Sequence, residues 1–155
     1  MQDVVKLLIE KNKTISTMES CTGAYIANSI TNIPDASKVF SFSAVTYSND
    51  FKIKMGVSKE LIDKYSVYSM EVASNMAYCI SNYTDSNYGI GVTGKLNKVD
   101  VNNLYGDDNL VFISIYDQDN DFYYNEIVQL ESFDRLVNKQ IILDKVVLML
   151  KEIIK

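Results

Sequence analysis

The stretch Thr14-Ile15-Ser16-Thr17-Met18-Glu19-Ser20-Cys21-Thr22-Gly23-Ala24 predicts a short β-strand that runs directly into an α-helix. The strand covers 14–18, and apolar residues recur with helical spacing over 24–32. Ser20 therefore falls at a strand-to-helix turn, where free backbone N–H groups and the helix dipole favour negative charge. Such a serine is either an N-cap or a nucleophile, and the local sequence alone favours a cap at Ser20 or Thr22.

A second predicted strand ends at another polar residue. Residues 38–47 alternate between apolar and polar side chains and finish at Tyr47. Ligands gather at the carboxyl ends of strands in α/β sheets, so Ser20 and Tyr47 face one crevice if the two strands are parallel. Asn49 or Asp50 then starts a helix over 50–55, which places Lys52 in its first turn. Because the helix dipole opposes a positive charge there, Lys52 is either a solvated surface lysine or a base whose charged form is destabilised.

The remaining pattern completes an α/β chain. Ser58 and Ser69 are predicted helix caps, and the glycines of the apolar strand 88–93 indicate a close approach of backbone. We expect a three-layer α/β/α sandwich with a mixed sheet, in which parallel strands carry the site and a late hairpin adds antiparallel strands. The other predicted elements are a helix over 2–12, helices over 58–65 and from Ser69, a polar loop over 95–108, hairpin strands over 109–116 and 122–130, and a helix over 132–154.

Composition restricts the class of function. The 155 residues (1–155) suit a single domain, and the formal net charge of −5 with scattered basic residues argues against nucleic-acid binding. Residues 1–13 lack a signal-peptide pattern and no apolar run approaches a membrane span, so we expect a cytoplasmic protein without membrane contact. Cys21 and Cys79 form no CxxC pair; we interpret Cys79 as a core residue.

The chain contains no histidine. This excludes Ser-His and Cys-His catalysis and the common imidazole metal sites. Any general base must therefore be a lysine, a tyrosine or a carboxylate, and we expect neither a metal nor a cofactor.

Two blocks of sequence together resemble a known signature. Glu19-Ser20-Cys21-Thr22-Gly23, followed by Val45-Thr46-Tyr47-Ser48-Asn49-Asp50-Phe51-Lys52, resembles the CinA C-terminal domain family, the nicotinamide mononucleotide deamidases. Ser37 and Phe40 between the blocks match as well. The resemblance implies hydrolysis of the carboxamide of this small nucleotide to a carboxylate, with release of ammonia. Ser20 would be the nucleophile and Lys52 its base, while Tyr47 would orient Lys52 or relay a proton.

The resemblance also implies a set of substrate-binding residues. The backbone N–H groups of 21–23 and the Thr93 hydroxyl would stabilise the oxyanion, and Ser37 and Arg135 would bind the ribose-phosphate end. Cys21 is a rival nucleophile, because a thiol at a helix N-terminus has a lowered pKa. The full set is Cys21, Thr22, Gly23, Ser37, Asn49, Thr93, Gly94 and Arg135.

One segment departs from the family pattern. After Thr93-Gly94 the family continues with glycine-proline-glycine, whereas this chain has Lys95-Leu96-Asn97-Lys98-Val99-Asp100. The altered 95–108 loop supports an alternative, a non-catalytic nucleotide-binding or regulatory module that has lost activity.

The second half of the predicted helix 132–154 is apolar nearly all round. Such a helix is buried in the monomer or in a subunit interface, so we expect a homodimer.

Overall fold

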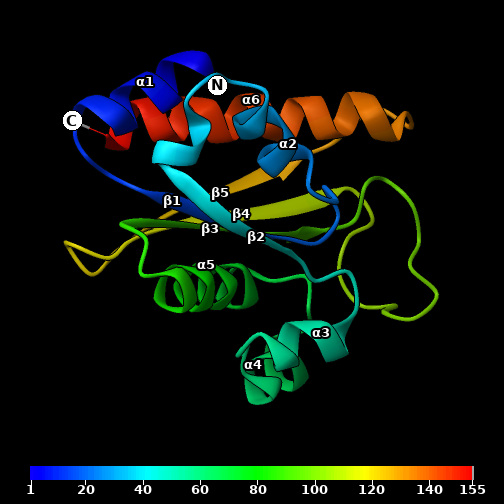
Figure 1. Ribbon diagram of the computed structural model, residues 1–155. Coiled ribbons are helices and arrows are strands. Elements are labelled where there is room, and N and C mark those ends of the chain that lie inside the picture. Colours follow the sequence, from blue (N-terminus) through cyan, green and yellow to red (C-terminus); the bar gives the residue numbers. More distant parts are fainter. Residues whose placement is uncertain (155) are drawn as a thin grey trace.

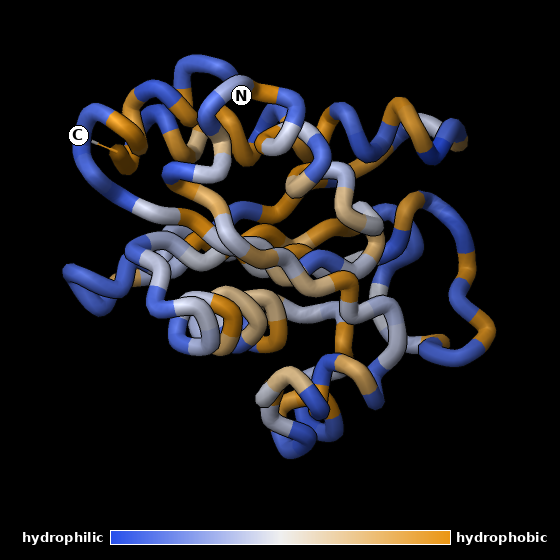
Figure 2. The backbone as a smooth tube through the Cα atoms, viewed as in Figure 1, coloured by the Kyte–Doolittle hydropathy of each residue, from blue (hydrophilic) through white to orange (hydrophobic). Residues whose placement is uncertain are grey.

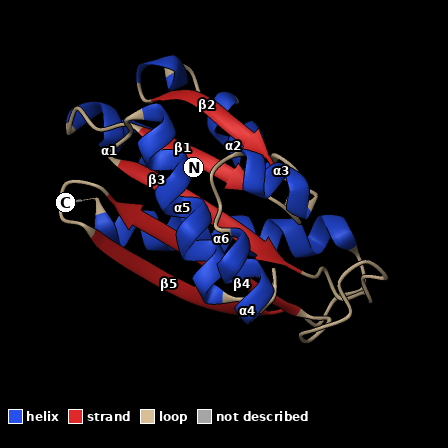
Figure 3. Cartoon of the chain, turned by 90° about the horizontal axis from the view of Figure 1, so that it is seen from below, coloured by secondary structure: helices blue, strands red, loops and turns tan. Residues whose placement is uncertain are grey.

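The computed structural model describes residues 1–154 and shows three layers, with helices on both faces of one sheet (Figure 1). Lys155, the last residue of the predicted single domain, lies outside the described residues. The sheet has the order β2-β1-β3-β4-β5, which Figure 3 shows from below. β1 pairs in parallel with β2 and β3, whereas β4 pairs antiparallel with β3 and β5. The strands are β1 (Ile15–Glu19), β2 (Phe40–Val45), β3 (Tyr88–Gly94), β4 (Leu110–Asp117) and β5 (Phe122–Gln129). The predicted α/β/α sandwich with a mixed sheet is confirmed.

Seven helical segments surround this sheet in the described part of the chain. In Figure 1, α1, α2 and α6 cover one face, while α5 lies on the other with α3 and α4 beyond it. None of the helices within residues 1–154 has both the length and the apolar character that a membrane crossing requires. The segments are α1 (Gln2–Glu10), α2 (Tyr25–Thr31), the short 3-10 helix η1 (Ala36–Lys38), α3 (Asn49–Lys54), α4 (Lys59–Tyr65), α5 (Met70–Thr84) and α6 (Arg135–Ile153).

The core has one apolar cluster on each side of the sheet. The larger cluster joins α1, α2 and α6 to the sheet through their buried hydrophobic residues. Hydrophobic positions recur at intervals along these helices (Figure 2). The smaller cluster contains Met76 and lies against α5. A Cβ atom on Gly91 would lie 2.1 Å from the Ala73 carbonyl oxygen, and one on Gly89 would lie 2.1 Å from that of Ala77. The predicted close approach of backbone at these glycines is therefore confirmed.

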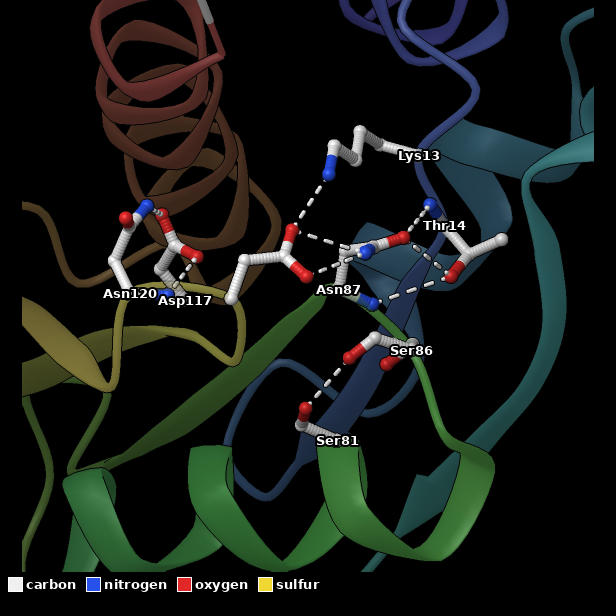
Figure 4. A network of polar contacts seen from close by, with 8 residues as sticks. Lys13, Thr14, Ser81, Ser86, Asn87, Asp117 and Asn120 are labelled. Carbon is white, nitrogen blue, oxygen red and sulfur yellow. Dashed lines mark hydrogen bonds and ion pairs between the residues drawn. The ribbon is translucent and has the colours of Figure 1, made fainter.

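A polar network ties the strands together at the end of the sheet opposite Ser20 (Figure 4). Asn87, just before β3, accepts from the Thr14 backbone N–H at 2.9 Å and donates to Asp119 in the turn between β4 and β5. Lys13 completes the network with a 2.6 Å ion pair to Asp119. These polar groups satisfy one another, so the network fixes the starts of β1 and β3.

Helix starts agree with the sequence at three positions and differ at one. The hydroxyls of Ser58 and Ser69 cap α4 and α5 as predicted. α3 begins at Asn49, one of the two predicted starters, and its cap is Ser48, which accepts from the Phe51 N–H. α6 begins at Arg135 rather than at 132, because the Asp134 carboxylate accepts from the N–H groups of the next turn.

Two burial predictions are refined by the structure. Cys79 is half-buried at the margin of the smaller cluster rather than fully inside it. α6 buries one face and exposes apolar side chains on another, so the helix is not buried all round. Its exposed apolar residues, with the preceding Phe133, are Phe133, Leu136, Val137, Ile141 and Leu148. The homodimer stays a prediction.

Candidate active site

Ser20 and Lys52 form a buried pair between the end of β1 and the helix α3. The Lys52 Nζ donates to Ser20 Oγ at 3.0 Å and to the Thr46 carbonyl oxygen at 2.6 Å. Only 1% of Lys52 is exposed, so its interpretation as a solvated surface lysine was wrong. The parallel strands β1 and β2 end at the same edge of the sheet, which is why residues 32 positions apart meet there.

Burial sets the protonation of this lysine. It lowers the pKa of Lys52 from 10.5 to about 8, while the nearby Asp100 carboxylate opposes that change. Removing an ammonium group from water penalises its charged form, so the amine is neutral in a substantial fraction of molecules near pH 8. A neutral amine in contact with a hydroxyl can act as a general base.

The turn that carries Ser20 leaves two backbone donors free. Gly23 and Ala24 both adopt left-handed conformations, with φ of 60° and 67°. The Gly23 N–H donates to the Ser20 carbonyl oxygen at 3.1 Å, so this amide is already engaged. The N–H groups of Cys21 and Thr22 donate to no other residue among those described. The predicted oxyanion donors over 21–23 thus reduce to two candidates.

Glu19 holds this turn in place, and the sequence analysis did not identify it. Its buried carboxylate accepts from the backbone N–H groups of Ile26 at 3.1 Å and Ala27 at 2.9 Å, at the start of α2. A carboxylate satisfies both the free donors and the positive end of the helix dipole. The signal was present in the sequence as an acidic residue directly after the predicted strand 14–18, ahead of the helix predicted over 24–32.

Cys21 is a poor thiolate in this environment. Burial raises the pKa of its thiol to about 12, although the nearby Lys52 opposes this change. The predicted lowering of the Cys21 pKa was therefore wrong, because desolvation of the thiolate outweighs the effect of the helix start. This leaves Ser20 as the better nucleophile.

The pair opens into a pocket of about 460 Å³, a volume typical of small-molecule sites. Tyr47 and Arg135 stand at this pocket, and an Arg135 guanidinium nitrogen donates to the Tyr47 hydroxyl at 3.4 Å. Tyr47 is 66% exposed, and its side-chain hydrogen bond is with Arg135. The Lys52 amine donates instead to the Thr46 carbonyl oxygen. Of the predicted site residues, those that line the pocket are Ser20, Cys21, Tyr47, Asn49, Gly94 and Arg135.

Thr22 and Gly23 belong to the turn that carries Ser20 but do not line the pocket, and two further predicted site residues lie elsewhere. Thr93 is buried and its hydroxyl donates to the Val67 carbonyl oxygen at 2.9 Å, so that proton is engaged away from any substrate. Ser37 is exposed in η1, before the start of β2, whereas the pocket lies beyond the end of that strand. The structure does not bring Ser37 to Ser20, because the length of β2 separates them.

The 95–108 loop forms one wall of the pocket and projects on the right of Figure 1. Lys95 is buried at its base and pairs with Asp108 at 2.9 Å. Further along, the Tyr68 hydroxyl donates to Asp100, and Asn49 donates to Asn103 at 3.0 Å. Apart from Asn49, sequence reasoning missed these residues, since nothing in the loop indicates which of its polar side chains turn inward.

Named relatives match part of this chain in sequence. A competence-damage inducible protein of Clostridium kluyveri is 46% identical over 96 residues, which are 61% of this chain and 23% of that protein. A similarly named protein of Alkaliphilus oremlandii is 47% identical over 92 residues, 59% of this chain and 22% of that protein. This chain therefore spans about a quarter of the length of these curated relatives.

Solved structures with the same fold extend the comparison. A CinA superfamily protein from Klebsiella pneumoniae superposes with a TM-score of 0.90 at 17% identity, covering 99% of this chain and 94% of that one. The competence/damage inducible protein CihA from Agrobacterium tumefaciens gives 0.80 at 26% identity, covering 99% and 93%. The model of the CinA C-terminal domain matches residues 1–154, and the chain therefore belongs to the CinA C-terminal domain family.

Proposed function

We propose that this protein is an amide hydrolase that converts nicotinamide mononucleotide to nicotinate mononucleotide and ammonia. The observation that carries the proposal is the 3.0 Å contact between the buried Lys52 amine and the Ser20 hydroxyl. A serine needs a base to become a nucleophile, and this chain has no histidine to supply one. The substrate class comes from the family resemblance, and the pocket volume supports it.

Acylation begins with neutral Lys52. The Ser20 hydroxyl transfers its proton to the amine as its oxygen attacks the carboxamide carbon, giving a tetrahedral oxyanion. The free N–H groups of Cys21 and Thr22 are the donors we assign to that oxyanion. The protonated Lys52 then gives its proton to the amide nitrogen, the C–N bond breaks, and ammonia leaves an acyl ester on Ser20.

Deacylation repeats the same proton path. Lys52, neutral again, takes a proton from water as the water oxygen attacks the ester carbon. The C–O bond to Ser20 breaks and the serine oxygen recovers the proton from Lys52. The carboxylic acid that results loses its remaining proton to solvent and leaves as the carboxylate. The Thr46 carbonyl accepts one amine hydrogen throughout, so it orients the lone pair of Lys52 toward Ser20.

The cationic side of the pocket is suited to the phosphate of the substrate. Arg135 is the first residue of α6, and its guanidinium lies between this pocket and a neighbouring one of about 570 Å³. Lys98 lines both pockets as well. Two cations beside an open volume favour a phosphate there, with Arg135 able to bind it in bidentate fashion.

Ammonia release from nicotinamide mononucleotide by the purified protein tests the proposal. We expect release by the wild-type protein and loss of at least a hundredfold in Ser20→Ala and in Lys52→Ala, as typical for removal of a nucleophile or its base. Cys21→Ala is the matched control, because its thiol occupies the adjacent position and should be dispensable. Full activity in Ser20→Ala refutes the assigned nucleophile, and a folded wild-type protein that binds the nucleotide without releasing ammonia favours the non-catalytic module.

A further inference from the structure

Asp100 places a carboxylate in the wall of the pocket that contains Ser20. It lies in the 95–108 loop between β3 and β4. The Tyr68 hydroxyl and the Asn103 side-chain amide both donate to Asp100 Oδ2, the latter at 3.0 Å. The Asn102 backbone N–H donates to Oδ1 at 2.9 Å. Three donors from two segments thus hold this carboxylate in one position.

The Asp100 carboxylate keeps its negative charge. Burial works against ionisation, but the hydrogen bonds from Tyr68 and Asn103 outweigh it and lower the pKa of Asp100. Within residues 1–154 it forms no direct ion pair. Lys95 lies over the Tyr68 ring and adds to the lowering of the Asp100 pKa, but its own ion pair is with Asp108 at 2.9 Å. The pocket therefore presents a fixed anion that hydrogen bonds satisfy and that, among the described residues, has no directly paired cation.

Charged residues are distributed unevenly around this pocket. Arg135 and Lys98 line both this pocket and its neighbour, whereas Asp100 lines only this one, as do Asp50 and the ion-paired Lys95. Asp100 lines the same pocket as Ser20 and its charge acts on the Lys52 amine, so it lies on the side of the reacting pair. A ligand that fits this arrangement has a positive group near its reacting amide and a negative group at its far end.

We infer that Asp100, positioned by Tyr68, is the counter-ion of a positively charged ring in the substrate and selects an oxidised pyridinium nucleotide over its neutral, reduced form. This inference rests on the proposed function. The pyridinium ring of nicotinamide mononucleotide carries its positive charge beside the carboxamide, while the phosphate lies at the other end. Asp100 is thereby a specificity-determining residue that takes no part in proton transfer.

Equilibrium binding tests this inference separately from catalysis. Binding of nicotinamide mononucleotide and of its 1,4-dihydro form is measured by titration calorimetry in the Ser20→Ala background, which prevents turnover. The two ligands share the amide, the ribose and the phosphate and differ in ring charge. The test variant is Asp100→Asn, and the matched control is Asp107→Asn, an exposed carboxylate of the same loop that does not line the pocket.

Asp100→Asn is expected to weaken binding of the oxidised nucleotide about tenfold, the size of one partly screened charge pair, and to change binding of the reduced form less than twofold. Asp107→Asn should leave both affinities within twofold. Equal weakening of the binding of both ligands overturns the inference, since it would show that Asp100 only supports the loop. An unchanged affinity for the oxidised form overturns it as well.

The outcomes also separate this inference from the proposed function. Charge-selective binding without ammonia release from the Ser20-containing protein supports the inference and refutes the amidase. Ammonia release with no charge selectivity refutes the inference alone. A protein that binds neither nucleotide refutes both.

Discussion

Replacing Lys52 by methionine is expected to abolish activity and, at the same time, to stabilise the fold. The side chain is almost fully buried, and burial lowers its pKa from 10.5 to about 8. At about 1.4 kcal/mol per pKa unit, the folded protein loses about 3 kcal/mol by holding this charge below pH 8. Methionine removes that cost but leaves the Thr46 carbonyl without its lysine donor, and this lost hydrogen bond reduces the gain in stability by about 1 kcal/mol. The expected net gain is about 2 kcal/mol at pH 7.

The gain has a defined pH dependence. Between about pH 8 and 10.5 the unfolded chain still protonates Lys52 while the folded protein does not, so wild-type stability from this group rises with pH across that window. The advantage of Lys52→Met should therefore be full below pH 8 and nearly absent at pH 10. Tyrosines with raised pKa values, such as Tyr88, are present in both proteins and cancel in the difference.

Urea denaturation followed by far-UV circular dichroism at pH 7, 8, 9 and 10 measures both effects. A gain of about 2 kcal/mol corresponds to a melting temperature about 4 to 8 °C higher for a chain of this size. Lys54→Met, on the exposed side of the same helix, is the matched control and should change stability by less than about 1 kcal/mol at every pH. A Lys52→Met protein that is less stable than wild type at pH 7, or whose advantage does not depend on pH, refutes the reasoning.

Three further predictions concern the same structure. The kcat/KM for ammonia release should rise about tenfold per pH unit below pH 8 and level off above it, because only neutral Lys52 accepts the Ser20 proton. A flat profile from pH 6 to 9 would contradict this assignment. Gly91→Ala should lower the free energy of unfolding in urea by about 3 kcal/mol, since the new methyl group would meet the backbone of α5. A decrease below about 1 kcal/mol would show that α5 can move away from the sheet. Asp134→Ala should lower the stability of the protein by about 1 kcal/mol through loss of the α6 cap, whereas Asp134→Asn should keep most of that stability because its side-chain oxygen still accepts. Equal decreases of both variants in a thermal melt would argue against capping.

Local patterns in the sequence determined the elements and the turn that carries Ser20. Alternation and helical spacing located the five strands and most helix starts, and the turn formers between the last two strands indicated their antiparallel pairing. The order of the strands in the sheet did not follow from the sequence. The absence of histidine restricted the base to a few residue types. The resemblance of two short blocks then paired Ser20 with Lys52, and the structure places these side chains in contact.

Tertiary structure alone decided how these groups behave. Whether Lys52 is solvated or buried depends on which face of α3 meets the sheet, and burial reverses the predicted direction of the Cys21 pKa change. Ser37 and Thr93 have suitable side chains, but the length of β2 removes one from the pocket and the Val67 carbonyl engages the other. The inward position of Asp100 arises from contacts with Tyr68 and Asn103 that no local pattern encodes, because they depend on how a long irregular loop folds back over the edge of the sheet.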